Sequence, residues 1–177
     1  MEITRTASQV VYRNRWMTVR EDRIVRPSGA EGIYGVVEKP DFAIIAAIDG
    51  GCIWLVEQYR YPVGGRYWEM PQGTSERGAI DPALLAAAEL REETGLVAAS
   101  MVHAGRLFAA YGYSSQGFNV YLARGLQQSQ PERDPEEEGL IAKPFDLATF
   151  EQMLVSGAIQ DAPTVAAFGL LRLKGHL

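Results

Sequence analysis

The sequence predicts an α+β fold, a mixed α/β sandwich in which helices pack on a mixed β-sheet. Apolar segments with the alternation or the short continuous runs of strands fill the first part of the chain. An alanine-rich helical segment follows at 82–94, more strands come after it, and two helical segments lie near the end. Strands around one helix, followed by two late helices, are typical of layered α and β structure.

Turn signals separate the expected strands before the helix. Arg26-Pro27-Ser28-Gly29 is one turn, and Asp49-Gly50-Gly51 predicts a tight hairpin between two apolar strands. A short strand ends at the break in Met70-Pro71-Gln72-Gly73. The expected strands cover 9–13, 16–26, 32–39, 42–48, 52–59 and 67–73, then 100–108 and 118–123.

The last third of the chain predicts a loop and two helices. Residues 127–139 are polar, acidic and proline-bearing, so we expect a surface loop there. Asp146 is a helix N-cap, and the helix it opens is expected to end at Gly157. Asp161 opens the second helix, whose apolar residues continue to Leu173.

Composition limits the class of protein. The chain has 177 residues, of which 47% are hydrophobic and 22% charged, as in a globular domain with its own core. A net charge of -5 argues against nucleic acid as the main partner. We expect no secretory leader and no membrane span, because no long apolar run is present. The single Cys52 lies in an apolar strand, which predicts a buried packing residue, and it allows no internal disulfide, which fits the cytoplasm.

The most informative segment is the helix expected at 82–94, which Asp81-Pro82 opens and Gly95 ends. Its residues Glu89, Glu92 and Glu93 are spaced i, i+3 and i+4, so their carboxylates share one face. Like charges at this spacing repel unless water or a cation separates them. The face is therefore either a solvated surface or a site for a hard cation such as Mg²⁺, which also binds substrate phosphates.

These residues resemble the Nudix box, G-x5-E-x7-R-E-U-x-E-E-x-G-U, where U is a bulky aliphatic residue. Gly73 is the opening glycine, and the residues from Glu89 to Leu96 match the second half of the box. The chain departs from the pattern in its first half: the span from Gly73 to Glu89 is one residue longer, and the first glutamate is missing near Ala79 or Ile80. Ala88 also replaces the arginine that orients the glutamates in this family.

Outside the box, the chain is similar to the branch of the family that hydrolyses ADP-ribose and nucleoside diphosphate sugars. The resemblance rests on Val56-Glu57-Gln58-Tyr59-Arg60-Tyr61-Pro62, on Trp68-Glu69-Met70-Pro71, and on the segment from Ile159 to Thr164. It implies an α/β/α sandwich of the Nudix type and cleavage of a nucleoside diphosphate derivative into two monophosphates. It also implies an N-terminal β extension at 1–39 that builds a homodimer, and a hydrolase core at 40–177 whose substrate site uses both subunits.

By the same resemblance, Glu89 and Glu93 are the principal ligands of Mg²⁺, with Mn²⁺ as the second candidate metal. Glu92 binds a further metal or positions water, and the backbone carbonyl of Gln72 completes the inner shell. The residues Glu137 and Glu138 lie in the acidic loop, which is either a solvated charge run or a lid that carries a catalytic glutamate.

Five further side chains are candidates for binding the substrate. Arg60 either pairs with a phosphate or forms a salt bridge with Glu57 or Glu69. The aromatic residues either pack in the fold or stack on a base; they are Trp16, Tyr34, Tyr111 and Tyr113.

Two other functions remain open at this point. The first is hydrolysis of a dinucleoside polyphosphate or a capped end, because Pro71-Gln72-Gly73 and a tyrosine beyond the box resemble that branch. The second is a sensor that binds a nucleotide without hydrolysing it, because the box lacks its first glutamate and its arginine.

Overall fold

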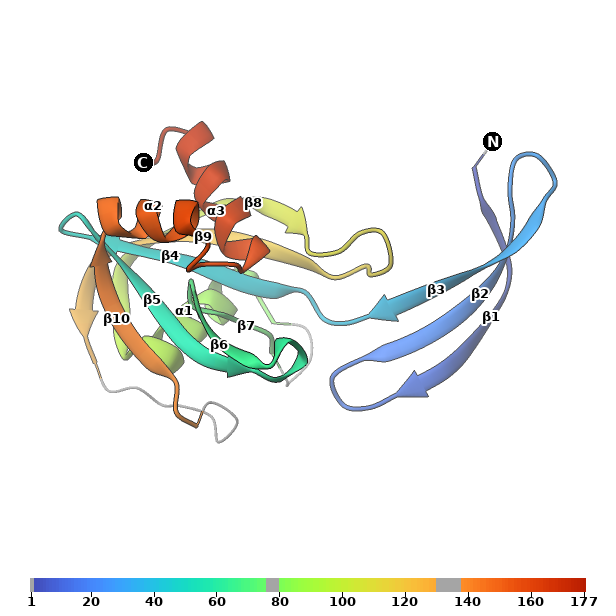
Figure 1. Ribbon diagram of the computed structural model, residues 1–177, viewed down its shortest axis with the longest axis horizontal. Coiled ribbons are helices and arrows are strands. Elements are labelled where there is room, and N and C mark those ends of the chain that lie inside the picture. Colours follow the sequence, from blue (N-terminus) through green and yellow to red (C-terminus); the bar gives the residue numbers. More distant parts are fainter. Residues whose placement is uncertain (1, 76–79, 130–137) are drawn as a thin grey trace.

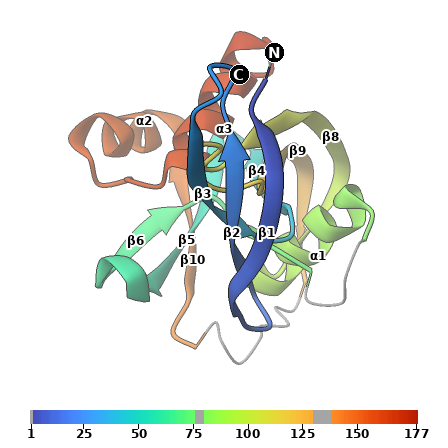
Figure 2. The same ribbon diagram turned by 90° about the vertical axis from the view of Figure 1, so that its right-hand side faces the viewer.

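A computed structural model describes residues 2–75, 80–129 and 138–177. The chain forms two parts, a small sheet from the N-terminal end and a larger body in which helices flank a second sheet (Figure 1). The two parts are joined where the last strand of the small sheet leads into the body. Figure 2 shows the small sheet standing in front of the body when the molecule is turned by 90°.

The small sheet, called the arm sheet below, has the strand order β1-β2-β3 and is antiparallel. Every residue of β1 is exposed to solvent, and the strand lies at the edge of this sheet, where it pairs with β2. The turn between β1 and β2 is closed by the Asn14 side chain, which accepts hydrogen bonds from the backbone of Trp16 and Met17. The strands are β1 (Thr4–Arg13), β2 (Thr18–Val25) and β3 (Glu31–Glu38).

The body contains a mixed sheet with the strand order β10-β5-β4-β9-β8, in which β6 pairs with β5 and β7 pairs with β4. Strands β4 and β9 run parallel, and the other pairs are antiparallel. A 3-10 turn, η1 (Tyr61–Val63), leads from β5 to β6. The strands are β4 (Phe42–Asp49), β5 (Cys52–Arg60), β6 (Gly65–Glu69), β7 (Gln72–Gly73), β8 (Leu96–Phe108), β9 (Gly117–Gln128) and β10 (Ile141–Asp146).

The helices begin and end where the sequence predicts. Asp81, Asp146 and Asp161 are the N-caps, and each side chain accepts a backbone N–H of the first helical turn. Gly95 and Gly157 follow the first two helices in the left-handed conformation that glycine adopts most easily. The helices are α1 (Pro82–Thr94), α2 (Leu147–Ser156) and α3 (Ala162–Leu173).

Two layers of side chains hold the body together, one on each face of the sheet. On one face Ile44 packs with Phe150 of α2 and Phe168 of α3. On the other face its neighbour Ile45 packs with Leu90 of α1. Successive residues of β4 therefore point to opposite helices, which confirms the predicted sandwich, and Figure 1 shows α1 on the opposite side of the sheet from α2 and α3.

Three local expectations are wrong. Strand β10 was not expected, and residues 127–128 belong to β9 rather than to a loop. Cys52 is half-buried rather than buried, because it begins β5 directly after the Gly50-Gly51 turn, at the turn end of the hairpin. Among the described helices, none is long and apolar enough to cross a membrane.

The packing of α1 on the sheet generates a stability prediction. Leu90 is 1% exposed, so Leu90→Ala should lower the free energy of unfolding by about 2–4 kcal/mol through lost burial and the cavity left behind. Leu84 of the same helix is 64% exposed, and Leu84→Ala should change it by less than about 0.5 kcal/mol. Urea denaturation of both variants measures the difference, and equal losses would show that α1 does not pack as described.

Candidate active site

Strand β7 and helix α1 bring the predicted carboxylates together. Two residues after the buried Met70, β7 pairs with β4 through Gln72 and Ile44, which fixes its backbone against the centre of the sheet. Helix α1 packs beside it, and Glu93 is 2% exposed while Glu89 is 7% exposed. Glu92 is half-buried. The prediction that this face is a merely solvated surface is therefore wrong for Glu89 and Glu93.

Each buried carboxylate contacts the β7 backbone. The Oε2 atom of Glu93 accepts the backbone N–H of Gln72 at 3.0 Å. The carboxylate of Glu89 lies directly over Gly73, where a Cβ atom would collide with all of its carboxyl atoms. Glycine is therefore required at position 73 by close approach, which is the physical reason for the glycine that opens the box in this chain.

The donor chemistry of this region fits a hard divalent cation. Two buried carboxylates one helical turn apart repel each other, and a cation beside them would lower the cost of burying both charges. Oxygen atoms from Glu89, Glu93 and the Gln72 carbonyl are the ligand type that Mg²⁺ takes. Within 2–75, 80–129 and 138–177, no group of three or more His, Cys, Asp or Glu side chains already converges on a metal position.

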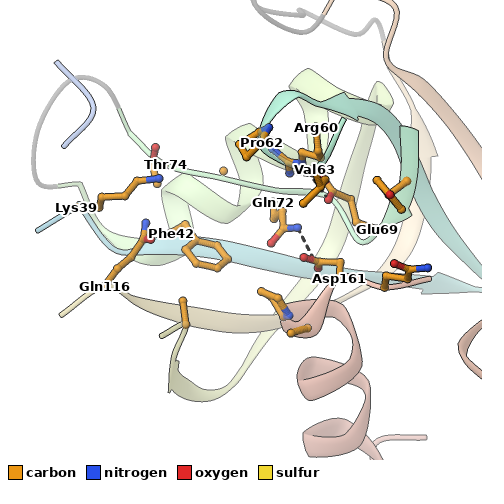
Figure 3. Close-up of a pocket in the computed structure, with 16 residues that line it drawn as sticks. Lys39, Phe42, Arg60, Pro62, Val63, Glu69, Gln72, Thr74, Gln116 and Asp161 are labelled. Atoms are coloured by element: carbon orange, nitrogen blue, oxygen red, sulfur yellow. Dashed lines mark hydrogen bonds and ion pairs between the residues drawn. The ribbon is translucent and has the colours of Figure 1, made fainter. Parts of the chain in front are cut away.

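A pocket of about 650 Å³ opens beside Gln72 and Gly73 (Figure 3). Its walls come from segments that are far apart in the sequence. They are the β3–β4 connection, η1, β6, the β8–β9 loop and the beginning of α3. The lining residues are Lys39, Phe42, Arg60, Pro62, Val63, Tyr67, Glu69, Gln72, Gly73, Thr74, Ala109, Gln116, Gln160, Asp161, Ala162 and Pro163.

One wall of the pocket contains an ion pair between Arg60 and Glu69. Glu69 is 2% exposed and accepts hydrogen bonds from both the Nε and the terminal nitrogen of Arg60 and from Gln58. Burial raises the pKa of the Glu69 carboxyl, and the opposing effects of Arg60 and Gln58 do not restore its ordinary value. Of the partners left open for Arg60, the structure shows Glu69; Glu57 pairs with Arg66 instead, at 2.8 Å.

Another wall is built on Asp161, the N-cap of α3. Its Oδ2 atom accepts the Thr164 backbone N–H at 2.9 Å, the Thr164 hydroxyl at 2.7 Å and the Gln72 side-chain amide at 3.1 Å. The Thr164 hydroxyl in turn accepts the backbone N–H of Met70 at 2.9 Å. These bonds fix the start of α3 to the β6–β7 segment.

The aromatic candidates lie outside this pocket in the same chain. Trp16 is in the β1–β2 turn, 46% exposed, with the Arg15 guanidinium over its ring. Tyr34 of β3 donates a hydrogen bond to the Gly112 carbonyl, and the Tyr113 ring, 59% exposed, projects from the same β8–β9 loop. Tyr111 of that loop is 83% exposed. The structure therefore does not bring these side chains to the carboxylates within one chain.

The acidic-loop candidates are placed only in part. Glu138 is exposed just before β10, and Glu137 lies outside the described residues. The sequence-based site omits three charged residues that line the pocket, Lys39, Glu69 and Asp161. The sequence predicted Asp161 as a helix cap, and the resemblance of the segment from Ile159 to Thr164 to the ADP-ribose branch was the signal that could have placed it in the site. Lys39 carries no local signal, since only the fold brings it to the pocket.

Comparisons with known proteins agree with this geometry. The family model for the NUDIX domain matches residues 38–168, and the model for the nucleoside diphosphate sugar hydrolase N-terminal domain matches residues 3–37. The ADP-ribose pyrophosphatase of Mycobacterium tuberculosis is 33% identical over 162 residues, which are 90% of this chain and 78% of that protein. The ADP-ribose pyrophosphatase of Bacillus subtilis is 26% identical over 173 residues, 97% of this chain and 93% of that protein.

A solved structure supports the fold. The crystal structure of an ADP compounds hydrolase superposes with a TM-score of 0.85 at 24% sequence identity, covering 99% of this chain and 96% of that one. At this identity the likeness concerns the fold, and it includes the arm sheet as well as the body because nearly the whole chain is covered.

The contact between Glu89 and Gly73 predicts that replacing glycine by alanine has opposite effects at position 73 and at position 169. Gly73→Ala should lower the free energy of unfolding by about 1–3 kcal/mol, because the added methyl group collides with a buried carboxylate. Gly169 lies in α3 with open space at its Cβ position, so Gly169→Ala should raise stability by about 0.5–1 kcal/mol through helix propensity. Thermal and urea unfolding test both, and a neutral Gly73→Ala would contradict the close approach.

Proposed function

This chain belongs to the Nudix family, and from that premise we propose that it hydrolyses the diphosphate bond of a nucleoside diphosphate joined to a second group. ADP-ribose and nucleotide sugars are the substrate class. Water is added across the P–O–P linkage, which gives two monophosphates. The observation that carries the proposal is the buried pair Glu89 and Glu93, held against Gln72-Gly73 at the edge of a pocket of about 650 Å³. The activity named for the two bacterial relatives supports the choice of substrate.

The proposed metal is Mg²⁺, with Mn²⁺ as the alternative. Glu89, Glu93 and the backbone carbonyl of Gln72 are the proposed ligands, and Glu92 holds a further ion or positions water. When bound, a divalent cation neutralises charge on the diphosphate and lowers the pKa of its bound water. The hydrogen bond from the Gln72 N–H to Glu93 orients that carboxylate, and the burial of Glu89 and Glu93 limits competing water.

Positive charge in the pocket comes from Lys39 and Arg60. The protein has a net charge of -5, so binding a diphosphate requires cations placed locally. Arg60 is held by Glu69 but keeps 40% of its side chain exposed. Lys39 has no ion-pair partner among the described residues, which leaves its ammonium group available to a phosphate. The proposed proton acceptor is Glu138 or Glu137, with Glu92 and Glu93 as the other candidates.

We also propose that two chains form a homodimer through the arm sheet, residues 1–39, while residues 40–177 form the hydrolase core. The arm sheet leaves large apolar side chains exposed, including Val11 at 57% and Ile33 at 64%. Asp22 of the same sheet is 5% exposed and pairs with Arg20, which also pairs with Glu38 of β3, so these charges are balanced within the arm sheet. In the dimer, Trp16, Tyr34 and Tyr113 are proposed to reach the partner's pocket.

The proposed location is the cytoplasm. Its support is the single cysteine, Cys52, which is free and half-buried in a chain that has no second cysteine to pair with.

A hydrolysis panel tests the function. Purified protein is incubated with ADP-ribose, nucleotide sugars, a dinucleoside polyphosphate and a capped RNA, each with Mg²⁺, with Mn²⁺ and with a chelator. We expect metal-dependent release of two monophosphates from ADP-ribose or a nucleotide sugar. Preference for the dinucleoside polyphosphate or the capped end would overturn the substrate class, and binding without release under every condition would indicate a sensor.

Glu93→Gln is predicted to lower turnover on the order of 100-fold or more, because the amide keeps the shape of the side chain but removes a charge that the metal needs. Circular dichroism and thermal unfolding should show the same fold as the wild type. The control Glu151→Gln changes a glutamate of α2 that is 41% exposed at its side chain and pairs with Arg172, and it should retain full activity. Near wild-type rates for Glu93→Gln would remove Glu93 from the metal site.

The homodimer is predicted to have twice the chain mass of 19.5 kDa by light scattering at micromolar concentration. An obligate interface of this kind buries roughly 2,000 Å² or more. Ile33→Lys places a charge on the exposed face of β3 and should shift the protein toward the monomer. Val155 is 91% exposed on α2, so Val155→Lys should leave the mass unchanged. A monomeric wild type would contradict both the dimer and the shared site.

A further inference from the structure

The Gln72 side chain is fixed in the pocket by a partner that determines the orientation of its amide. The Nε2 atom lies 3.1 Å from Oδ2 of Asp161, an oxygen that already accepts two hydrogen bonds from Thr164. An acceptor of this kind requires a donor, so the NH₂ group faces Asp161 and the amide oxygen faces away from it. Figure 3 shows the Gln72 amide between Asp161 and the open part of the pocket.

The oxygen atom that remains is an acceptor without a protein donor. Among the described residues, no group donates a hydrogen bond to Oε1 of Gln72, and the residue is half-buried in the pocket wall. Its backbone is tied to Glu93 and Ile44, and its amide is tied to Asp161. The backbone and the amide nitrogen of Gln72 therefore hold its Oε1 atom in place before a ligand binds. A hydrogen bond from a ligand to this oxygen then costs little conformational entropy in the protein.

The position of Gln72 indicates which part of a ligand meets this oxygen. The backbone N–H of the same residue binds Glu93, so the side chain begins at the carboxylate site where the diphosphate must lie. The substrate group nearest to a diphosphate is the sugar esterified to it, and a sugar presents hydroxyl donors. A base lies one group further away. A hydroxyl of a sugar is therefore the donor that fits the reach of this side chain.

We propose that Gln72 is a specificity-determining residue whose Oε1 atom accepts a hydrogen bond from a hydroxyl of the sugar adjoining the diphosphate, with Asp161 and Thr164 as the residues that position it. The inference rests on the proposed function and deepens it. A hydrogen bond of this kind would favour diphosphates that carry a hydroxylated sugar over diphosphates that carry an alkyl group in the same position.

Three compounds and two variants test the inference. The compounds are ADP-ribose, an ADP ester with an ethyl group in place of the distal ribose, and an ADP-ribose whose nucleoside sugar lacks both hydroxyls. Gln72→Met keeps the length of the side chain but removes the acceptor and the donor. Gln72→Asn keeps an amide that is too short to reach Asp161. Gln152→Met, on the exposed surface of α2, is the matched control. Hydrolysis in the presence of Mg²⁺ gives kcat/KM for each compound. Calorimetry in the presence of a chelator, which prevents metal-dependent hydrolysis, gives Kd, and thermal unfolding checks the fold.

We expect Gln72→Met and Gln72→Asn to lower kcat/KM for ADP-ribose and weaken its binding by about tenfold, the worth of one net hydrogen bond. The loss should disappear with one of the two sugar-deficient compounds, and that compound identifies which sugar donates the hydroxyl. Gln152→Met should match the wild type throughout.

An equal loss with all three compounds, or no loss with any, would overturn the role of Gln72 while leaving the proposed function standing. A wild type that binds the compounds without hydrolysing them would overturn the proposed hydrolysis, and the Kd values alone would then decide the role of Gln72. If the wild type neither binds nor hydrolyses them, the proposed function and this inference both fail.

Discussion

The contact between helix α1 and strand β7 is the constraint on which the rest of this structure depends. It places Glu89 and Glu93, both nearly inaccessible to water, against the backbone of Gln72 and Gly73. Such an arrangement needs a short strand anchored on the centre of the sheet, a glycine where the carboxylate approaches, and a helix whose apolar side is fixed by Leu90. Two like charges buried close together repel each other, so the divalent cation proposed for this site would stabilise the fold on binding.

The same strand connects this site to the pocket. Backbone atoms of Gln72 hold the carboxylate side, while its side chain holds Asp161 and through it the beginning of α3. The pocket is lined by two cationic and two anionic side chains. Lys39 and Arg60 are cationic, and Glu69 and Asp161 are anionic. Because Glu69 and Asp161 already have partners, the positive charge for the proposed diphosphate would come from Lys39, from the exposed part of Arg60 and from the proposed metal.

Features with a local chemical cause could be predicted from the sequence. The three Asp caps, the Gly stops and the hairpin turn determine the helices and the β4–β5 pair, and the i, i+3, i+4 spacing places three glutamates on α1. Strand β10 was missed because Pro144 lies within it, and proline is tolerated there only because β10 is an edge strand.

The pocket could not be predicted in the same way, because distant segments form its walls. The fold brings together Lys39, Gln116 and Asp161, which are far apart in the sequence. No local sequence pattern indicates that they line the same pocket. The partner of Arg60 was likewise decided by the β5–β6 pairing, in which Glu69 lies opposite Val56 and within reach of the guanidinium. Trp16 and Tyr34 belong to the N-terminal part of the chain, away from the pocket, so the role proposed for them depends on the proposed dimer.

Binding of Mn²⁺ to the wild-type protein, measured by calorimetry in the absence of nucleotide, tests the central claim most directly. If the buried carboxylates of α1 form a cation site, Mn²⁺ should bind and raise the melting temperature as its concentration increases, because a ligand that binds only the native state stabilises it. A protein that takes up no Mn²⁺, and whose melting temperature is the same with the metal and with a chelator, would contradict the account.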